Sequence, residues 1–167
     1  MSATRAILFT FTTYGTWLRG DARGWVDDGV VFPANPRLED LDRENLKHDP
    51  YYFDRSKRVK VANEMVLQLK RRLHLRVHAI CVQKWHSHVV TGATRHHVSE
   101  IAKCAKDAAT WFLREGRPIW GADFDKRYCF DDRSARNRID YVERHNLEDG
   151  LPARVVPILD DYRGFAI

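Results

Sequence analysis

Two β-type segments joined by a two-residue link lie between two helical patterns, and this arrangement constrains the fold more than any other feature. The segments are residues 73–83 and 86–92, and the link between them is the dipeptide KW. So short a link favours antiparallel pairing of neighbouring strands. On either side, over residues 56–73 and 96–116, apolar residues recur at spacings of three and four, which is typical of amphipathic helices.

Further elements precede and follow this block. The stretch "RAILFTFTTYG" at residues 5–15 alternates apolar residues with threonine, which predicts a half-buried strand. A short strand is predicted near residues 127–130, and a last helix over residues 132–146 begins with an Asp or Ser suited to an N-cap. The order is typical of an α+β fold, the ferredoxin-like split βαβ sandwich. We therefore predict an antiparallel sheet with helices on one face, plus a C-terminal helix.

The length of 167 residues predicts a single domain over residues 1–167. Residues 15–52 contain several glycines and prolines and are predicted to form an irregular insertion, in which "GWVDDGVVF" is suited to a short hairpin. Residues 147–167 are predicted to be a C-terminal tail. No apolar run approaches the roughly 20 residues that a membrane span needs, so no membrane partner is expected.

The three cysteines match neither a zinc pattern nor a disulfide framework, so we expect a reducing compartment such as the cytoplasm. The net charge is +5 at pH 7, and arginine makes up most of the 28 Lys and Arg residues. Because the guanidinium group presents a planar fork of donors that matches phosphate oxygens, this bias indicates a polyanionic partner such as nucleic acid. The alternative is that the charge serves solubility alone.

The stretch "KWHSHVV" contains the histidine pair His86 and His88. Side chains alternate along a strand, so both imidazoles are expected on one face, roughly 6–7 Å apart, with Ser87 on the other. Two imidazoles so close can bind one divalent cation. The alternative is a pair of partly buried histidines bonded to neighbouring groups.

The last predicted helix carries Tyr141 and His145 at positions i and i+4, so both lie on one helical face. A third imidazole there would complete a metal set with His86 and His88 and place Tyr141 beside the ion. The metal would polarise a phosphate, and the tyrosine hydroxyl would attack it to give a covalent phosphotyrosine. The alternatives are a packing tyrosine and a histidine that interacts with the helix dipole.

These residues resemble the HUH-type single-tyrosine transposases of bacterial insertion sequences, including the REP-associated tyrosine transposases. The resemblance rests on "WHSHVV", "IDYVERHN" and the opening "FTFTTYGTWLRGD", and it covers nearly the whole chain outside residues 20–52. It implies a metal-dependent endonuclease and strand transferase of the bacterial cytoplasm. Such an enzyme recognises a hairpin in single-stranded DNA and cleaves through a 5′-phosphotyrosine. It also implies that Tyr141 is catalytic, that His86, His88 and His145 bind metal, and that the metal is Mg²⁺ or Mn²⁺.

Two departures from the family pattern leave questions open. Ser87 stands where relatives usually carry a hydrophobic residue, and Asn146 stands where many carry proline. The second departure leaves open whether His145 or Asn146 completes the metal set. A set made only of histidines is equally suited to zinc, nickel or cobalt. The resemblance also leaves open a monomer or a homodimer, in which the tyrosine helix serves the partner's histidines.

Basic residues on two predicted helices are expected to contact the DNA, although solvated helix faces would look the same. They are Arg133, Arg136, Arg138 and Arg144 on the last helix, and Lys57, Lys60, Arg71 and Arg72 on the first long helix. The insertion adds rings for base stacking, which are Trp17, Trp25, Tyr51 and Tyr52.

The main alternative function is a domesticated DNA- or repeat-binding protein of the same fold that does not transpose DNA. A histidine-triad hydrolase is disfavoured because Val90 stands where a third histidine belongs. An RNA-recognition module is disfavoured because the central strands lack paired aromatic residues.

Overall fold

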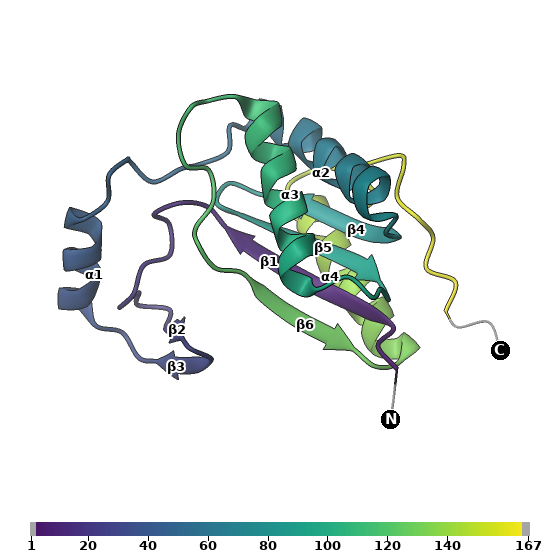
Figure 1. Cartoon of the computed structure of the whole chain (residues 1–167), viewed down its shortest axis with the longest axis horizontal. Coiled ribbons are helices and arrows are strands. Elements are labelled where there is room, and N and C mark those ends of the chain that lie inside the picture. The colour runs from purple at the N-terminus through teal and green to yellow at the C-terminus, as the bar shows by residue number, and fades with distance from the viewer. Residues whose placement is uncertain (1–2, 165–167) are drawn as a thin grey trace.

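A four-stranded antiparallel sheet forms the centre of the computed structural model, which describes residues 3–164 (Figure 1). Its strands are β1 (Ala6–Thr12), β4 (Val77–Val82), β5 (His86–Gly92) and β6 (Asp125–Cys129). They lie in the order β4-β5-β1-β6, and each neighbouring pair is antiparallel. This is the strand order of the ferredoxin-like split βαβ arrangement, so the predicted fold class is confirmed.

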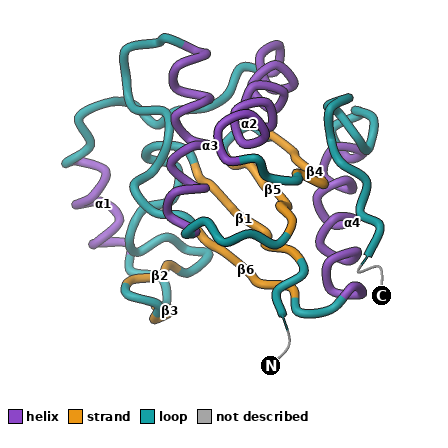
Figure 2. Tube along the Cα trace, turned by 45° about the vertical axis from the view of Figure 1, so that its right-hand side comes forward, coloured by secondary structure: helices purple, strands orange, loops and turns teal. Residues whose placement is uncertain are grey.

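The three long helices cover both faces of the sheet. Helices α2 (Arg58–Leu73) and α3 (Val98–Leu113) pack on one face, and α4 (Asp132–Glu148) packs on the other (Figures 1 and 2). Side chains of β1 alternate between the two layers. Phe9 therefore joins the core under α2 and α3, whereas Leu8 joins the smaller core under α4. The added C-terminal helix thus closes the face that the split βαβ unit leaves open.

The pairing of β1 with β5 decides which side chains look toward α4. Thr10 lies opposite His88, and Thr12 lies opposite His86. All four residues are in phase with Leu8 of the α4 layer, because side chains alternate strictly along each strand. Both histidines therefore project to the face that α4 covers.

The insertion contains more regular structure than the sequence indicated. The expected hairpin is present as β2 (Trp25–Asp27) and β3 (Val30–Phe32), and it is followed by an unexpected helix, α1 (Pro36–Glu44). Asn35 caps α1 by accepting a hydrogen bond from the Leu38 amide. The cap and the proline after it are helix-start signals, but Leu38 and Leu41 are the only large apolar side chains of α1, and none of its residues is buried. So short an apolar pattern does not predict a helix by itself.

The tail after α4 returns along the outer edge of β4. The Asp160 amide donates to the Val77 carbonyl at 2.8 Å, and the Asp160 carboxylate accepts from the Val77 amide and from Lys70 Nζ at 2.9 Å. The Tyr162 hydroxyl then bonds Asp132, at the start of α4, at 2.6 Å. These contacts pair part of a sheet edge that would otherwise be free. Among the described residues, no helix is long and apolar enough to cross a membrane.

A candidate metal and nucleophile site between the sheet and helix α4

Three histidines converge between β5 and α4. His86 and His88 come from the strand and His145 from the helix. One ring nitrogen of each histidine lies within 4.8 Å of those of the other two. The ring centroids are 4.9 Å apart for His86 and His88, 5.9 Å for His86 and His145, and 5.0 Å for His88 and His145. The three residues that the sequence nominated as metal ligands therefore form one cluster.

The packing of α4 brings His145 to the strand. Ile139 and Val142 are buried against the sheet, and Asn146 is buried one residue after His145. The Asn146 amide donates to the carbonyl oxygens of Ile80 and Ala153, each at 2.9 Å. Asn146 thus ties α4 to β4, and the cluster contains the imidazole of His145 and not this amide.

Hydrogen bonds orient two of the three rings. His88 Nδ1 lies 2.9 Å from Thr10 Oγ1, and His145 Nδ1 lies 3.0 Å from the carbonyl oxygen of Tyr141. An imidazole that donates from Nδ1 keeps its Nε2 lone pair free, which is the usual second contact of a metal-binding histidine. The buried Nδ1 of His86 has no hydrogen-bond partner among the described residues. The donor set therefore fits a divalent cation.

The environment keeps the strand histidines neutral. Burial lowers the pKa of His86 to about 4, and the nearby His145 ring adds to this effect. Burial also lowers the pKa of His88 to about 3, with further contributions from His86 and His145. Neutral imidazole is the form that binds metals, so both rings are ready to coordinate at neutral pH.

Tyr141 lies directly beside the histidine cluster. Its ring centroid is 4.5 Å from that of His145 and 5.3 Å from that of His88. The ring is partly buried because it packs against the apolar cluster under α4. All four side chains belong to one chain, so the Tyr141 ring and the candidate metal set lie together without a group from a second copy.

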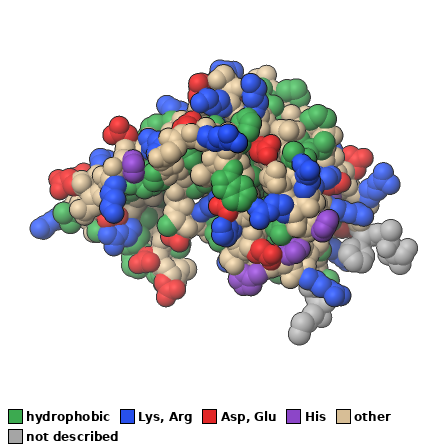
Figure 3. Space-filling model, turned by 45° about the horizontal axis from the view of Figure 1, so that its top comes forward, with side chains coloured by type: hydrophobic (Ala, Val, Ile, Leu, Met, Phe, Trp, Pro, Cys, Tyr) green, Lys and Arg blue, Asp and Glu red, His purple; other side chains and the backbone are tan. Residues whose placement is uncertain are grey.

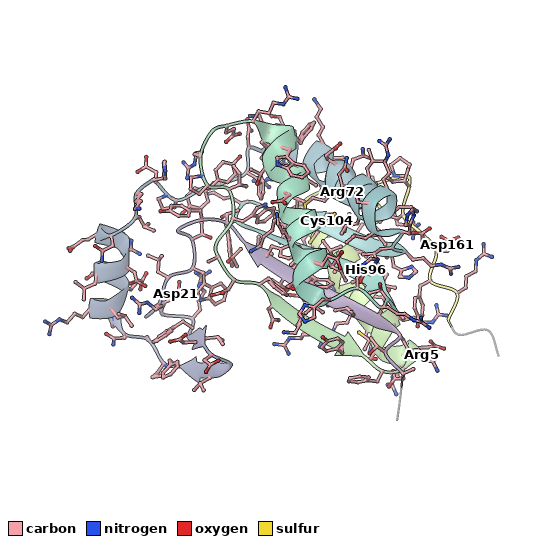
Figure 4. The ribbon with its side chains drawn as sticks, in the orientation of Figure 1. Arg5, Asp21, Arg72, His96, Cys104 and Asp161 are labelled. Atoms are coloured by element: carbon pink, nitrogen blue, oxygen red, sulfur yellow. The ribbon has the colours of Figure 1, made fainter. Side chains whose placement is uncertain are left out.

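The predicted DNA-contacting residues fall into two groups on opposite sides of the sheet. The first group, on α4, shares its helix with Tyr141 and His145, and of its arginines only Arg138 is half-buried. The second group lies on α2 and the turn before it, in the other helical layer, where Figure 4 labels Arg72. On the face shown in Figure 3, basic and acidic side chains are interspersed, without one continuous basic patch. The structure thus puts the first group on the same side of the sheet as the histidines and the second group on the opposite side.

The rings expected to stack on bases also divide. Tyr51 is 5% exposed and donates its hydroxyl to Glu115, so the expectation of an exposed ring is wrong there. Trp25 is half-buried and stacks on Phe32, whereas Trp17 and Tyr52 are exposed.

Two residues near the cluster were not predicted from the sequence. Thr10, on the neighbouring strand β1, orients His88. This contact follows from the pairing of β1 with β5, which the sequence does not show. Trp85 precedes the histidine pair, and its ring lies 4.5 Å from that of His86. Its position in "KWHSH" was the available signal.

The architecture and the cluster can be compared with known proteins. The chain shares its fold with a solved transposase. The similar structure is a REP-associated tyrosine transposase bound to a REP hairpin, with a TM-score of 0.54 over 99% of this chain and 93% of that one. The sequence identity is 12%, so this likeness establishes the fold alone. No protein-family model and no curated protein matches the sequence.

Proposed function

We propose that this protein is a metal-dependent endonuclease and strand transferase that cuts single-stranded DNA beside a hairpin, with Tyr141 as the nucleophile. The observation that carries the proposal is the position of the Tyr141 ring, 5.3 Å from His88 and 4.5 Å from His145 within one three-histidine cluster. A structural histidine cluster has no need of a tyrosine at its edge. A phosphoryl-transfer site needs a nucleophile held next to the group that binds the phosphate.

His86, His88 and His145 are the residues that would hold the ion, with Mg²⁺ or Mn²⁺ expected from the family resemblance. When bound, a divalent ion would polarise a phosphate oxygen and neutralise charge on the phosphodiester. Hydrogen bonds at Nδ1 hold two of the three imidazole rings in place for this role. Thr10 fixes His88, and the Tyr141 carbonyl fixes His145.

Tyr141 performs the covalent step. Its hydroxyl oxygen forms a bond to phosphorus while the bond from phosphorus to the 3′ oxygen breaks. The phenolic proton passes to solvent, and the departing 3′ oxygen takes up a proton to become a hydroxyl. One phosphodiester is exchanged for another, so a 3′ hydroxyl can attack the phosphotyrosine and reverse the step. The helix keeps the phenol in place because Ile139 and Val142, which precede and follow Tyr141, are buried against the sheet.

Single-stranded DNA with a hairpin is the substrate class that the comparison supports, since the similar structure carries a REP hairpin. The net charge of +5 favours a polyanion. Because the histidines lie under α4, we assign the DNA path to the α4 side and name the helix arginines Arg133, Arg136 and Arg144, all exposed, as phosphate contacts. The basic residues of α2 would be reached only by DNA that passes around the sheet.

The test is covalent capture. Purified protein is mixed with Mn²⁺ and labelled single-stranded hairpins taken from the DNA that flanks its gene, and adducts are resolved on a denaturing gel. We expect an adduct with the wild-type protein and none with Tyr141→Phe. Tyr128→Phe is the matched control, because Tyr128 is 43% exposed on β6 at the sheet edge, and it should still form the adduct. Tight binding of hairpins without any adduct would instead indicate a binding protein.

A further inference from the structure

The row of rings at the site extends beyond the histidines. Trp85 lies 4.5 Å from His86, and Trp17 from the insertion lies 5.7 Å from Trp85, measured between ring centroids. His86 and His88 follow at 4.9 Å, and His88 and Tyr141 at 5.3 Å. An unbroken arc of rings therefore runs from the insertion to the proposed nucleophile.

An arginine covers the far end of this arc. The Arg23 guanidinium carbon lies 4.1 Å from the Trp17 ring centroid and 4.7 Å from that of Trp85. The Asp21 carboxylate accepts hydrogen bonds from Arg23 Nε at 2.8 Å and from Nη2 at 2.6 Å. Asp21 is almost fully buried, in the loop between β1 and β2 (Figure 4). The guanidinium plane is therefore held in one orientation against both indoles.

The backbone around these rings is pinned as well. The amide and the hydroxyl of Thr13 both donate to the Trp85 carbonyl, at 2.9 and 3.2 Å. Trp17 Nε1 donates to the Gly24 carbonyl at 2.8 Å, and Arg23 Nη2 donates to the Thr16 carbonyl at 3.1 Å. Despite this rigid mounting, 40% of Trp17 and 44% of the Arg23 side chain stay open to solvent. Fixed but exposed planar groups are what a stacking surface requires.

We propose that Trp17, Arg23 and Trp85 form a stacking platform for the base of the nucleotide next to the scissile phosphate. This inference rests on the proposed function, because a base would lie on these rings only if the neighbouring phosphate were bound at the histidines. The occupant is a nucleobase, since the platform presents flat faces, with its two indoles tilted by 56°, and is continuous with the site that would hold a DNA phosphate. Arg23 is already paired with Asp21, so the platform offers faces of rings and little free charge. Stacking of this kind tolerates any base, because every base has a π-face.

The test measures the coupling between the platform and one base, without metal. Hairpin oligonucleotides carry a single abasic site at each position of the flanking strand in turn, and affinity is measured by fluorescence anisotropy in EDTA. With wild-type protein, one abasic position next to the cleavage point should weaken binding about tenfold, the size of one base–aromatic stack. Trp17→Ala should weaken binding of the intact oligonucleotide by a similar factor and should lose most of the abasic effect.

Three further variants define the result. Trp17→Phe retains a ring and should restore most of the affinity. Arg23→Lys keeps the charge but loses the planar group, so it should weaken the abasic effect. Trp111→Ala is the matched control, because Trp111 is exposed on α3, on the opposite side of the sheet, and it should leave the abasic effect intact. If Trp17→Ala and the abasic site act additively at every position, the platform does not exist.

Failure of this inference and failure of the proposed function give different results. A covalent adduct at Tyr141 together with additive effects would contradict the stacking platform and support the nuclease proposal. Coupling between Trp17 and one base without any adduct would leave the platform and remove the nuclease.

Discussion

Tyr141 and His145 lie one turn apart on α4, with ring centroids 4.5 Å apart, and the His145 imidazole bonds the Tyr141 carbonyl at 3.0 Å. The proposed nucleophile and one proposed metal ligand are therefore fixed relative to each other by a single helical turn. The same helix faces His86 and His88 of its own chain. All the side chains of the proposed site are thus present in one copy of the protein.

The first prediction concerns this completeness. Mixing Tyr141→Phe with His88→Ala should not restore DNA cleavage, because each variant lacks a group that only its own chain can supply. Covalent adduct formation is measured for each variant, for the mixture and for wild-type protein diluted with either variant. Recovery of activity in the mixture would show that the helix serves a partner's histidines.

The second prediction concerns the residue behind His88. Thr10→Val removes the hydroxyl that lies 2.9 Å from His88 Nδ1 and keeps a β-branched side chain in the strand. Loss of such an orienting bond lowers metal affinity by about 10–100-fold, which titration with Mn²⁺ would measure. Thr12→Val is the matched control on the same face of β1, opposite His86, and should change affinity less. Equal effects of the two changes would contradict the orienting role of Thr10.

The third prediction concerns the choice of metal. Imidazole ligands suit later transition metals, whereas Mg²⁺ prefers oxygen ligands, so Mn²⁺ should support cleavage at lower concentration than Mg²⁺. His145→Asp replaces one imidazole with a carboxylate and should narrow the difference between the two ions. Adduct yield is measured against the concentration of each ion after treatment with chelator. A wild-type protein that responds equally to both ions would argue against coordination by three histidines.

The fourth prediction concerns stability at low pH. Burial lowers the pKa of His78 below its usual value, although the Asp160 carbonyl bonded to it opposes this, and Arg76 and Arg154 lower it further. The ring also packs edge-on against Tyr162. Because the unfolded chain then binds a proton more readily than the folded one, the His78 contribution is complete above about pH 6.5 and is lost as the pH falls below it.

The measurement is urea unfolding in EDTA at pH 7 and pH 5. Wild-type protein should lose more unfolding free energy between these values than His78→Gln, which cannot be protonated. The comparison isolates His78 from the other titrating groups, since both proteins share them. An identical loss in the two proteins would show that His78 titrates alike in the folded and unfolded states.

The sequence by itself determined the local elements and the local part of the site. Alternation and helical periodicity predicted the four strands of the sheet and its three long helices. Such a pattern is local, because it depends only on which side of one element is buried. For the same reason, the sequence placed His86 and His88 on one face, and Tyr141 and His145 on one helical stripe. Helix α1 was not predicted because it buries no residues and its apolar pattern is limited to Leu38 and Leu41.

Only the tertiary structure decided which of these faces meet. The pairing of β1 with β5 brought Thr10 to His88, and the packing of α4 brought His145 to both strand histidines. The fold also placed the basic residues of α2 on the opposite side of the sheet, buried Tyr51, and laid Arg23 across Trp17 and Trp85. Most of these contacts join residues far apart in the chain. They depend on how different helices and strands pack together. The periodicity of one segment shows only which of its own faces is buried.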